Sequence, residues 1–362
     1  MGLSGKPNTK RRSAVILIAV AAFIALITVL AQYGVLNQYI QSVIMAIGIN
    51  IIFASSLNIV NGYMGEFSCG HAGFMAVGAY SSSMLSIILF TENPYLGSPL
   101  LPPGSAIALF PFVILAGGVA ASFAGLLVAI PSFKTRDDYL AIITIAANYI
   151  IMTTINNLEV VGASRGLMGM KGAITAMNGI VALPWVLLWI MLFVVLCVFA
   201  IYRLMNSVLG KGISAIRYDE ISAEIMSVDT NKMKLLAFMF SSGLAGVGGG
   251  LFAHMLNFIN PASFNILKST EGMVMVYLGG MGSLSGSVLS AVLFSFLLEA
   301  LRPLQILKWV VIPLLLILLM QFRPEGLMGN KELPYFWTRL VKLFRKMRAG
   351  RAFAGPLKGD GK

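Results

Sequence analysis

The stretch "NIVNGYMGEFSCGHAGFMAVGAY", residues 58–80, decides how this chain folds, because it interrupts long apolar runs with asparagine, glycine and glutamate. Residues 13–32 and 38–65 contain no charged side chain. Runs of this length match a hydrocarbon core of ~30 Å at a helical rise of ~1.5 Å per residue. Of the 362 residues, 58% are hydrophobic and 11% are charged, against roughly 25% charged in soluble domains. We therefore expect an all-α, polytopic membrane protein.

Within residues 58–80 we expect a helix, a break and a second helix. Asn58, Gly62 and Gly65 weaken a helix, and Ser68 is a candidate cap for the next one, which begins near residue 70. Non-helical backbone at membrane depth is tolerated only when it is buried in protein or lines a water-filled cavity. The break therefore marks either a tightly packed turn or part of a pathway.

The apolar runs predict spans at 13–33, 38–60, 70–90, 104–131, 139–157, 182–203 and 235–256. Beyond residue 272 a second Gly/Ser-rich run, "LGGMGSLSGS" (278–287), predicts a break between two limbs; the alternative is one tilted helix of about 30 residues. With the break, the chain has about ten membrane crossings, within a range of eight to ten. The pattern G-x-x-G-x-x-S occurs at Gly62–Ser68 and again at Gly279–Ser285, with Gly282 at its centre. An internal repeat and a chance match both remain open.

The positive charge is concentrated in the two tails. Residues 1–12 carry four Lys/Arg and no acid, and residues 322–362 carry ten Lys/Arg against three acids. The positive-inside rule places both ends, which flank a transmembrane domain at 13–321, in the cytoplasm, in reach of anionic lipid. The charge flanks membrane spans without forming a folded basic face, so nucleic-acid binding is not expected.

The reactive side chains near the first break do not form a catalytic or metal site. Glu66, Cys69 and His71 offer at most three ligands crowded into six residues, and two residues apart Cys69 and His71 do not share a helix face. We predict no metal site and no catalytic residue, with His71 as a hydrogen-bonded packing residue. For Glu66, a role in a pathway or gate and a solvated turn both remain open.

Residues 204–234 form the longest charged interior segment, and threading the chain places it in the cytoplasm. Asp219 is a plausible N-cap, followed by Glu220 in the first turn and by Ile221 and Ile225 at helical spacing. We expect a short amphipathic helix that either lies on the membrane or docks a cytoplasmic partner. The chain has no G-x-x-x-x-G-K-[ST] nucleotide motif.

Five segments together resemble the permeases of branched-chain amino-acid ABC importers. These are the opening stretch, "AIRYDEISAEIMSVDTNKMKLLAFMFSSGLAGVGGGLFAH" (215–254), "VYLGGMGSLSGSVLSAVL" (276–293), "QFRPEGLMG" (321–329) and "GASRGLMGM" (162–170). The last is similar to a loop of the LivM-type subunit rather than its LivH-type partner. The family usually has Gln where this chain has Glu66.

The resemblance implies a subunit without enzyme activity that passes branched-chain or related amino acids into the cytoplasm across a bacterial or archaeal inner membrane. Its implied partners are a second homologous permease, two ABC ATPases that bind ATP and Mg, and a periplasmic or lipid-anchored solute-binding protein; the chain itself binds no cofactor. The residues carried over as ATPase-facing are Arg217, Asp219, Glu220, Ala223 and Glu224. The residues that we assign to the translocation pathway or its helix breaks are Asn58, Gly62, Gly65, Glu66, Ser68, His71, Gly279, Gly282 and Ser285. Transport of urea, short amides or another small solute, and action as an autonomous carrier or channel, remain alternatives.

Overall fold

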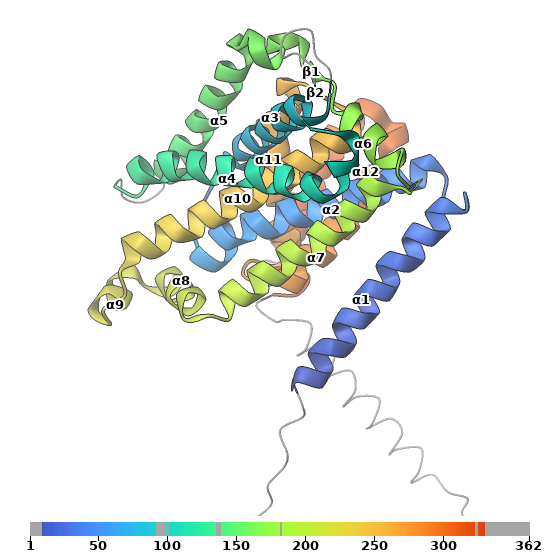
Figure 1. Cartoon of the computed structure of the whole chain (residues 1–362). Helices are drawn as coiled ribbons and strands as arrows, with labels where there is room; N and C mark the ends of the chain where they lie inside the picture. The colour runs from blue at the N-terminus through green and yellow to red at the C-terminus, as the bar shows by residue number, and fades with distance from the viewer. Residues whose placement is uncertain are drawn as a thin grey trace, which may run out of the picture.

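The computed structural model describes residues 9–91, 99, 101–134, 139–181, 183–322 and 325–329. Most of both predicted basic tails, and parts of the loops after residues 91 and 134, lie outside the described residues. The chain forms a helical bundle, with α1 standing beside it at one edge (Figure 1).

Seven helices fall on the seven predicted spans. They are α1 (Thr9–Gln32), α2 (Gln38–Asn58), α3 (His71–Phe90), α4 (Ala106–Ser132), α5 (Tyr139–Asn157), α7 (Trp185–Met205) and α10 (Thr230–Leu256). Shorter helices are α6 (Lys171–Asn178), α8 (Val208–Tyr218), α9 (Glu220–Ile225), α11 (Ile266–Gly279), α12 (Leu284–Ala300) and α13 (Lys308–Phe322). Short 3-10 turns occur at Pro103–Ser105, Glu159–Val161, Ala163–Arg165, Pro261–Phe264 and Arg302–Leu307. An antiparallel pair of two-residue strands, β1 (Leu167–Met168) and β2 (Phe258–Ile259), is the one departure from the all-helical prediction in the described residues.

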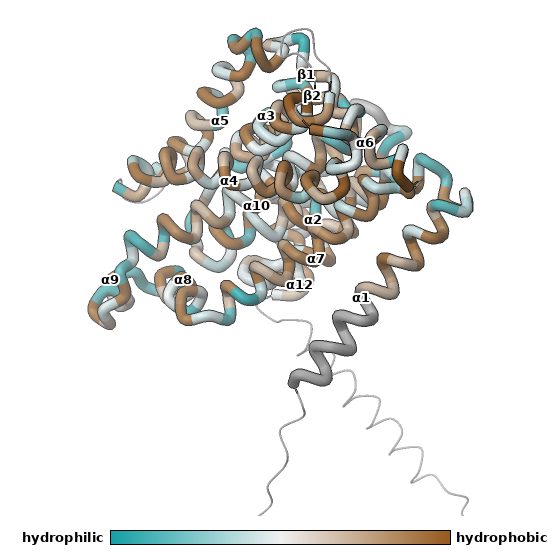
Figure 2. Tube along the Cα trace, in the orientation of Figure 1, coloured by the Kyte–Doolittle hydropathy of each residue, from teal (hydrophilic) through white to brown (hydrophobic). Residues whose placement is uncertain are grey.

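Six helices of the described residues are long and apolar enough to cross a membrane: Gln38–Met64, His71–Phe90, Ala106–Ser132, Tyr139–Asn157, Trp185–Met205 and Thr230–Leu256. Ala21–Gln32 and Leu284–Ala300 are shorter apolar helices. Figure 2 shows hydrophilic segments around α9 and, at the other end of the bundle, beside β1 and the far end of α5, with apolar helices between them. The count of about ten crossings and the sidedness of the termini therefore stay predictions.

The centre of the bundle is α10, which packs against α2, α3 and α4. Small residues permit this close packing: a Cβ at Gly78 of α3 would collide with the backbone of Gly246 of α10. Gly78 thus lies on a helix-packing surface of α3, as expected for helices that associate in lipid.

Both predicted breaks are present, but the first differs in form. Asn58 and Gly62 do not end the helix, because α2 continues through a π-helical turn, Ile59–Met64, that closes at Gly65 with φ of 83°. The backbone is then non-helical to Gly70, where α3 begins without a side-chain cap. The prediction that Ser68 caps α3 is therefore wrong; its backbone N–H instead donates to Asn61 Oδ1 at 3.2 Å.

The second break lies between α11 and α12, and it confirms the division of the apolar run after residue 272. The turn contains Gly280 and Gly282, whose φ angles of 110° and 80° favour glycine. Ser283 caps α12 by accepting a hydrogen bond from the Gly286 N–H at 3.1 Å. The alternative of one long tilted helix is therefore excluded.

Candidate functional site

The two breaks, more than 200 residues apart in the sequence, lie against each other in the structure. The side chain of Asn58 joins them: its Oδ1 accepts from the Gly282 N–H at 3.0 Å, and its Nδ2 donates to the Ser283 carbonyl at 3.0 Å. Asn58 is fully buried, so both hydrogen bonds are made away from water. The segments that share the G-x-x-G-x-x-S pattern thus form one junction, which we call the break junction (residues 58–68 and 279–285).

Glycine is required at the contact between the two segments. A Cβ at Gly62 would collide with both the Asn58 side chain and the backbone N of Gly282. Gly279 meets Gly286 in the same way, where a Cβ would lie 2.5 Å from the Gly286 carbonyl oxygen. Ser285 contributes its hydroxyl, 3.3 Å from that of Ser283. Gly62 therefore permits contact between the two breaks, and Gly279 permits the close approach of α11 and α12 within the second break.

Glu66 is held in an ion pair. Its carboxylate lies 2.7 Å from Lys234 Nζ, and the same Nζ lies 2.8 Å from the carboxylate of Glu220. The Lys234 side chain is 10% exposed, while those of Glu66 and Glu220 are 24% and 42% exposed. The ammonium also lies 5.8 Å from the centre of the Phe133 ring. The Glu66 carboxylate is thus partly exposed and paired with a largely buried lysine, and a pathway or gate role and a solvated turn both stay predictions.

Arg217, in the last turn of α8, contacts both breaks. Its Nη1 donates to the carbonyl of Met281 in the second break at 3.4 Å. Its aliphatic stem lies against Gly65 at the end of the first, where a Cβ would be 2.9 Å from Arg217 Cγ. Helices α8 and α9 are consequently joined to the break junction by Arg217 directly and by Glu220 through Lys234.

Asp219 caps α9, as predicted. Its Oδ1 accepts from the backbone N–H groups of Ile221 at 3.0 Å and Ser222 at 3.2 Å. The hydrogen bond from the Ser222 hydroxyl, at 2.7 Å, and then those backbone bonds lower the pKa of Asp219. The cap fixes where α9 begins, directly after α8.

The predicted short amphipathic helix after Asp219 is present, and its apolar side chains are exposed, as a helix that lies on the membrane or docks a partner requires. Only Glu220–Ile225 is helical, and Ala223 is the buried member. The large apolar side chains point outward, with exposed fractions of 79% for Tyr218, 71% for Ile221, 77% for Ile225 and 79% for Met226. We call these four residues, which lie on α9 or directly beside it in the sequence, the α9 apolar face. The spacing of Ile221 and Ile225 predicts an apolar face on this helix. Spacing alone does not say whether the rest of the chain covers that face.

The charged residues carried over as ATPase-facing have partners inside the chain. Glu224 accepts from the Thr230 hydroxyl at 2.8 Å, which ties α9 to the start of α10. Asp229 caps α10 through the Lys232 N–H at 3.1 Å. Sequence reasoning missed Lys234, which ends the charged segment 204–234 directly before an apolar run. Its carboxylate partners, Glu66 and Glu220, come within reach only in the folded chain.

His71 lies between three helices as a packing residue. Its Nε2 is 3.3 Å from the hydroxyls of both Ser56 and Ser241, and its ring is buried beside Phe53 and Phe74. Cys69 lies elsewhere, with its Sγ 3.7 Å from the sulfur of Met273. Among the described residues no group of three or more His, Cys, Asp or Glu side chains could hold a metal ion.

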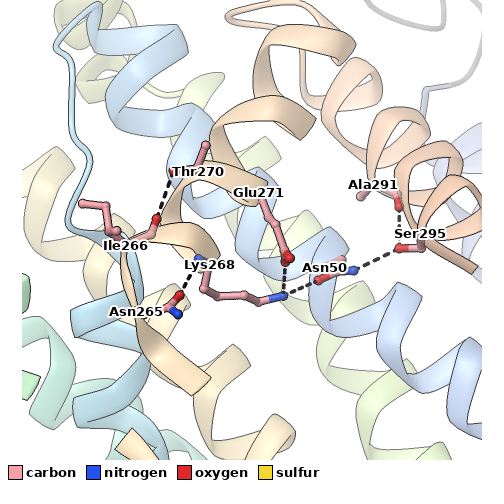
Figure 3. Close-up of polar contacts among 8 residues, drawn as sticks. All are labelled: Asn50, Asn265, Ile266, Lys268, Thr270, Glu271, Ala291 and Ser295. Carbon is pink, nitrogen blue, oxygen red and sulfur yellow. Dashed lines mark hydrogen bonds and ion pairs between the residues drawn. The ribbon is translucent and has the colours of Figure 1, made fainter. Parts of the chain in front are cut away.

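A second, partly buried charge pair was not predicted. On α11, Lys268 Nζ lies 2.9 Å from Glu271 Oε2, and it also reaches Asn50 Oδ1 of α2 at 3.4 Å (Figure 3). Asn50 in turn donates to the Ser295 hydroxyl of α12 at 3.0 Å. In the sequence, Lys268 is the single lysine between the predicted span that ends at residue 256 and the apolar run beyond residue 272, and no role was expected for it.

Comparison with known proteins gives consistent matches. Residues 39–320 match the family model described as "Branched-chain amino acid transport system / permease component". The high-affinity branched-chain amino acid transport system permease protein LivM of Escherichia coli (strain K12) is 32% identical over 307 residues, 77% of this chain and 68% of that protein. The probable permease LivM of Methanocaldococcus jannaschii is 24% identical, over 81% of this chain and 94% of that protein. LivH of Escherichia coli (strain K12) is 23% identical, over 78% and 91%. No solved structure matches.

Proposed function

Because this chain belongs to the family of branched-chain amino acid transport permease components, we propose that it forms half of the transmembrane pathway of an ATP-driven importer. Its partners are a second permease, two ABC ATPases on the cytoplasmic side and an external solute-binding protein. The relatives include permeases named LivM and LivH, which supports a pair of unlike permeases. ATP and Mg bind to the partner ATPases, and the chain carries no catalytic site of its own.

The observation that carries this proposal is the α9 apolar face together with its link to the break junction. These four large, exposed apolar side chains lie among hydrophilic residues, and we expect a protein partner to cover them. The segment behind them is rigidly tied inward, because Glu220 reaches Lys234 and Arg217 reaches Met281. A force applied at α9 therefore acts on both helix breaks.

In this mechanism the ATPases alter the pathway by moving α8 and α9. When the ATPases close on ATP, α9 moves with them, and the ion pairs through Lys234 carry the movement to Glu66 at the end of the first break. Arg217 carries it to the second break. ATP binding thus shifts the population between outward- and inward-facing states, because the ATPases bind the two positions of α9 differently.

The break junction provides the moving part. The π-helical turn at Ile59–Met64 and the glycine turn at Gly280–Ser283 can change backbone conformation more readily than the straight helices around them. Asn58 keeps the two breaks in register, so that they move together. Access for the solute then opens on one side of the membrane at a time, with both termini and α9 in the cytoplasm.

Co-isolation and uptake test this proposal. The tagged chain is expected to co-purify with two ATPase subunits, and Ile221→Glu/Ile225→Glu is expected to abolish co-purification by placing two carboxylates in the apolar contact. Val160→Glu, an equally exposed site (72%) at the β1–β2 end, is the matched control and should leave the complex intact. A complex that survives Ile221→Glu/Ile225→Glu would remove the basis for docking at α9.

Uptake of labelled leucine, alanine and urea into proteoliposomes identifies the solute. We expect ATP-dependent leucine uptake. Uptake of leucine without ATP or ATPases would instead indicate an autonomous carrier, and uptake of urea in place of leucine would indicate a permease for small amides.

A further inference from the structure

The partly buried pair of Lys268 and Glu271 lies beside the middle of the candidate membrane span Gln38–Met64. Its partner Asn50 stands close to the centre of the 27-residue span Gln38–Met64, so at ~1.5 Å per residue the pair lies far from either end. The Lys268 and Glu271 side chains are 18% and 15% exposed. Charged side chains at this depth are costly and usually serve a solute or ion pathway.

The helix α11 begins at this depth, which explains how the pair is placed. Asn265 caps the helix by accepting from the Lys268 N–H at 3.2 Å. Gly272 brings α11 against α2, since a Cβ there would lie 2.5 Å from Phe53 Cε1. With the helices this close, the Lys268 side chain extends over Asn50, as Figure 3 shows.

The hydrogen bonds around Asn50 fix its orientation. Its Nδ2 donates to the Ser295 hydroxyl, and that hydroxyl donates to the Ala291 carbonyl at 2.7 Å. The Asn50 amide oxygen is thereby turned toward Lys268 (Figure 3). A site whose polar groups are oriented in advance binds a ligand with less loss of entropy.

Stability alone does not require the pair, because apolar side chains of similar volume often replace a buried ion pair without loss of stability. The pair instead offers, within one helical turn, a cation and an anion of equal and opposite charge. Leu267, four residues before Glu271 and on the same helix face, adds an apolar side chain that is 48% exposed.

We propose that Lys268, Glu271 and Asn50 form a binding site for the head group of a zwitterionic α-amino acid in transit. The Lys268 ammonium donates to the α-carboxylate, the α-ammonium donates to the Glu271 carboxylate, and the solute side chain packs on Leu267. One ion pair opens and two form, so the site remains neutral with and without solute. The inference rests on the proposed transport function and names the site that function would use.

The test compares leucine uptake by the complete complex, with its ATPases and binding protein, in ATP-loaded proteoliposomes. The variant Lys268→Met/Glu271→Met removes both charges while keeping the volume. We expect it to assemble but to take up leucine at least about tenfold more slowly, as expected when charged hydrogen bonds to a ligand are lost. Glu299→Gln/Arg302→Gln removes a pair with the same i,i+3 spacing at the exposed end of α12, and its uptake should stay within about twofold of wild type.

The outcomes separate this inference from the transport proposal. If the wild-type complex takes up no leucine, the proposed function fails. If the wild type takes up leucine and Lys268→Met/Glu271→Met does so equally well, only the binding site is refuted.

A second measurement tests the site even if the variant Lys268→Met/Glu271→Met fails to assemble. Thr270→Cys places a thiol on the exposed face next to Glu271, in a Cys69→Ser background, and its maleimide labelling is followed in the otherwise wild-type complex. Leucine should slow labelling saturably, while isopentylamine and 4-methylpentanoate, which each lack one charge, should not. No protection by leucine, or equal protection by all three, would overturn the zwitterion site.

Discussion

Lys234 Nζ lies 2.7 Å from the carboxylate of Glu66, and this ion pair joins the start of α10 to the end of the first helix break. The same ammonium binds Glu220 of α9. One largely buried cation thus neutralises two carboxylates from segments that are about 150 residues apart. Because this contact connects a surface helix to a backbone irregularity inside the bundle, it is the feature through which docking and pathway would be coupled.

Replacing Lys234 should uncouple α9 from the first break. In Lys234→Met the carboxylates of Glu66 and Glu220 face each other without a cation, which should lower the free energy of unfolding by about 1–3 kcal/mol and reduce ATP-driven uptake. Chemical denaturation in detergent and proteoliposome uptake measure the two effects. Lys232→Met is the matched control, because the Lys232–Asp229 pair is exposed, at 78% and 47%, and its loss should change neither quantity. Equal behaviour of the two variants would contradict the role of Lys234.

Substitutions at Glu66 should separate hydrogen bonding from charge. Glu66→Gln keeps an oxygen acceptor for Lys234 and should retain most of the uptake. Glu66→Lys places two ammonium groups together and should impair uptake by at least about tenfold. Uptake by both variants is measured in parallel with co-purification of the ATPases, and similar uptake in both would mean that the carboxylate has no coupling role.

The sequence predicts the helices well and their contacts poorly. Apolar runs located seven long helices, and glycines located both breaks, because length and helix weakness are local properties. The meeting of the two breaks depends on Asn58 reaching Gly282 across the fold, and the partnership of Glu66 depends on Lys234. Neither contact can be predicted from the local spacing of residues. The sequence therefore identifies the residues of the break junction but does not show how they contact one another.

The Asn58 contact should be essential for the break junction. Asn58→Leu leaves the Gly282 N–H without its partner, at a cost of about 1–3 kcal/mol, while the Ser283 carbonyl keeps its hydrogen bond from the Ser287 N–H at 3.1 Å. Thermal unfolding of the purified complex should therefore occur at lower temperature. A melting temperature equal to that of the wild type would show that the two breaks do not depend on this side chain.

Gly62 should tolerate no side chain. Gly62→Ala adds a methyl group that collides with the Gly282 backbone, whereas Gly212→Ala in α8 adds one that meets only Met233 side-chain atoms, the nearest at 3.5 Å. We expect Gly62→Ala to lower the melting temperature and leucine uptake, and Gly212→Ala to change neither. Wild-type uptake by Gly62→Ala would show that the breaks can separate without loss of function.

The cap at Asp219 gives α9 a dependence on pH. Its hydrogen bonds lower the pKa of the carboxyl below the unfolded value of 3.8, so the ionised form is favoured in the folded chain. The stabilisation is fully present above that unfolded value and is lost as the pH falls through the lower folded one. The protection of the α9 amides against hydrogen exchange, relative to the intrinsic exchange rate at each pH, should be unchanged from pH 8 to pH 5. Asp219→Ala should lower this protection throughout, while Asp219→Asn, a good N-cap, should not. Equal exchange in Asp219→Ala and wild type would refute the cap.

Orientation of the α9 apolar face also lay beyond the sequence. Ile221 and Ile225 have the spacing of one helix face, and both are exposed in the structure, while Ala223 packs against the rest of the chain. A six-residue helix is held by its cap and its ion pairs rather than by an apolar stripe, and those long-range contacts come only from the folded chain. The exposed side chains then become the feature that predicts a partner.

Reversal of the charges around Lys234 tests the central claim, that α9 acts on the first break through this cation, most directly. ATP-driven leucine uptake is measured for Lys234→Glu and for Lys234→Glu combined with Glu66→Lys and Glu220→Lys, in complexes that all retain their ATPases. The single variant places three carboxylates together and should lose uptake at least about tenfold, while the triple variant restores both ion pairs and should recover most of it. An unchanged rate in Lys234→Glu, or a triple variant no more active than the single one, would contradict the account.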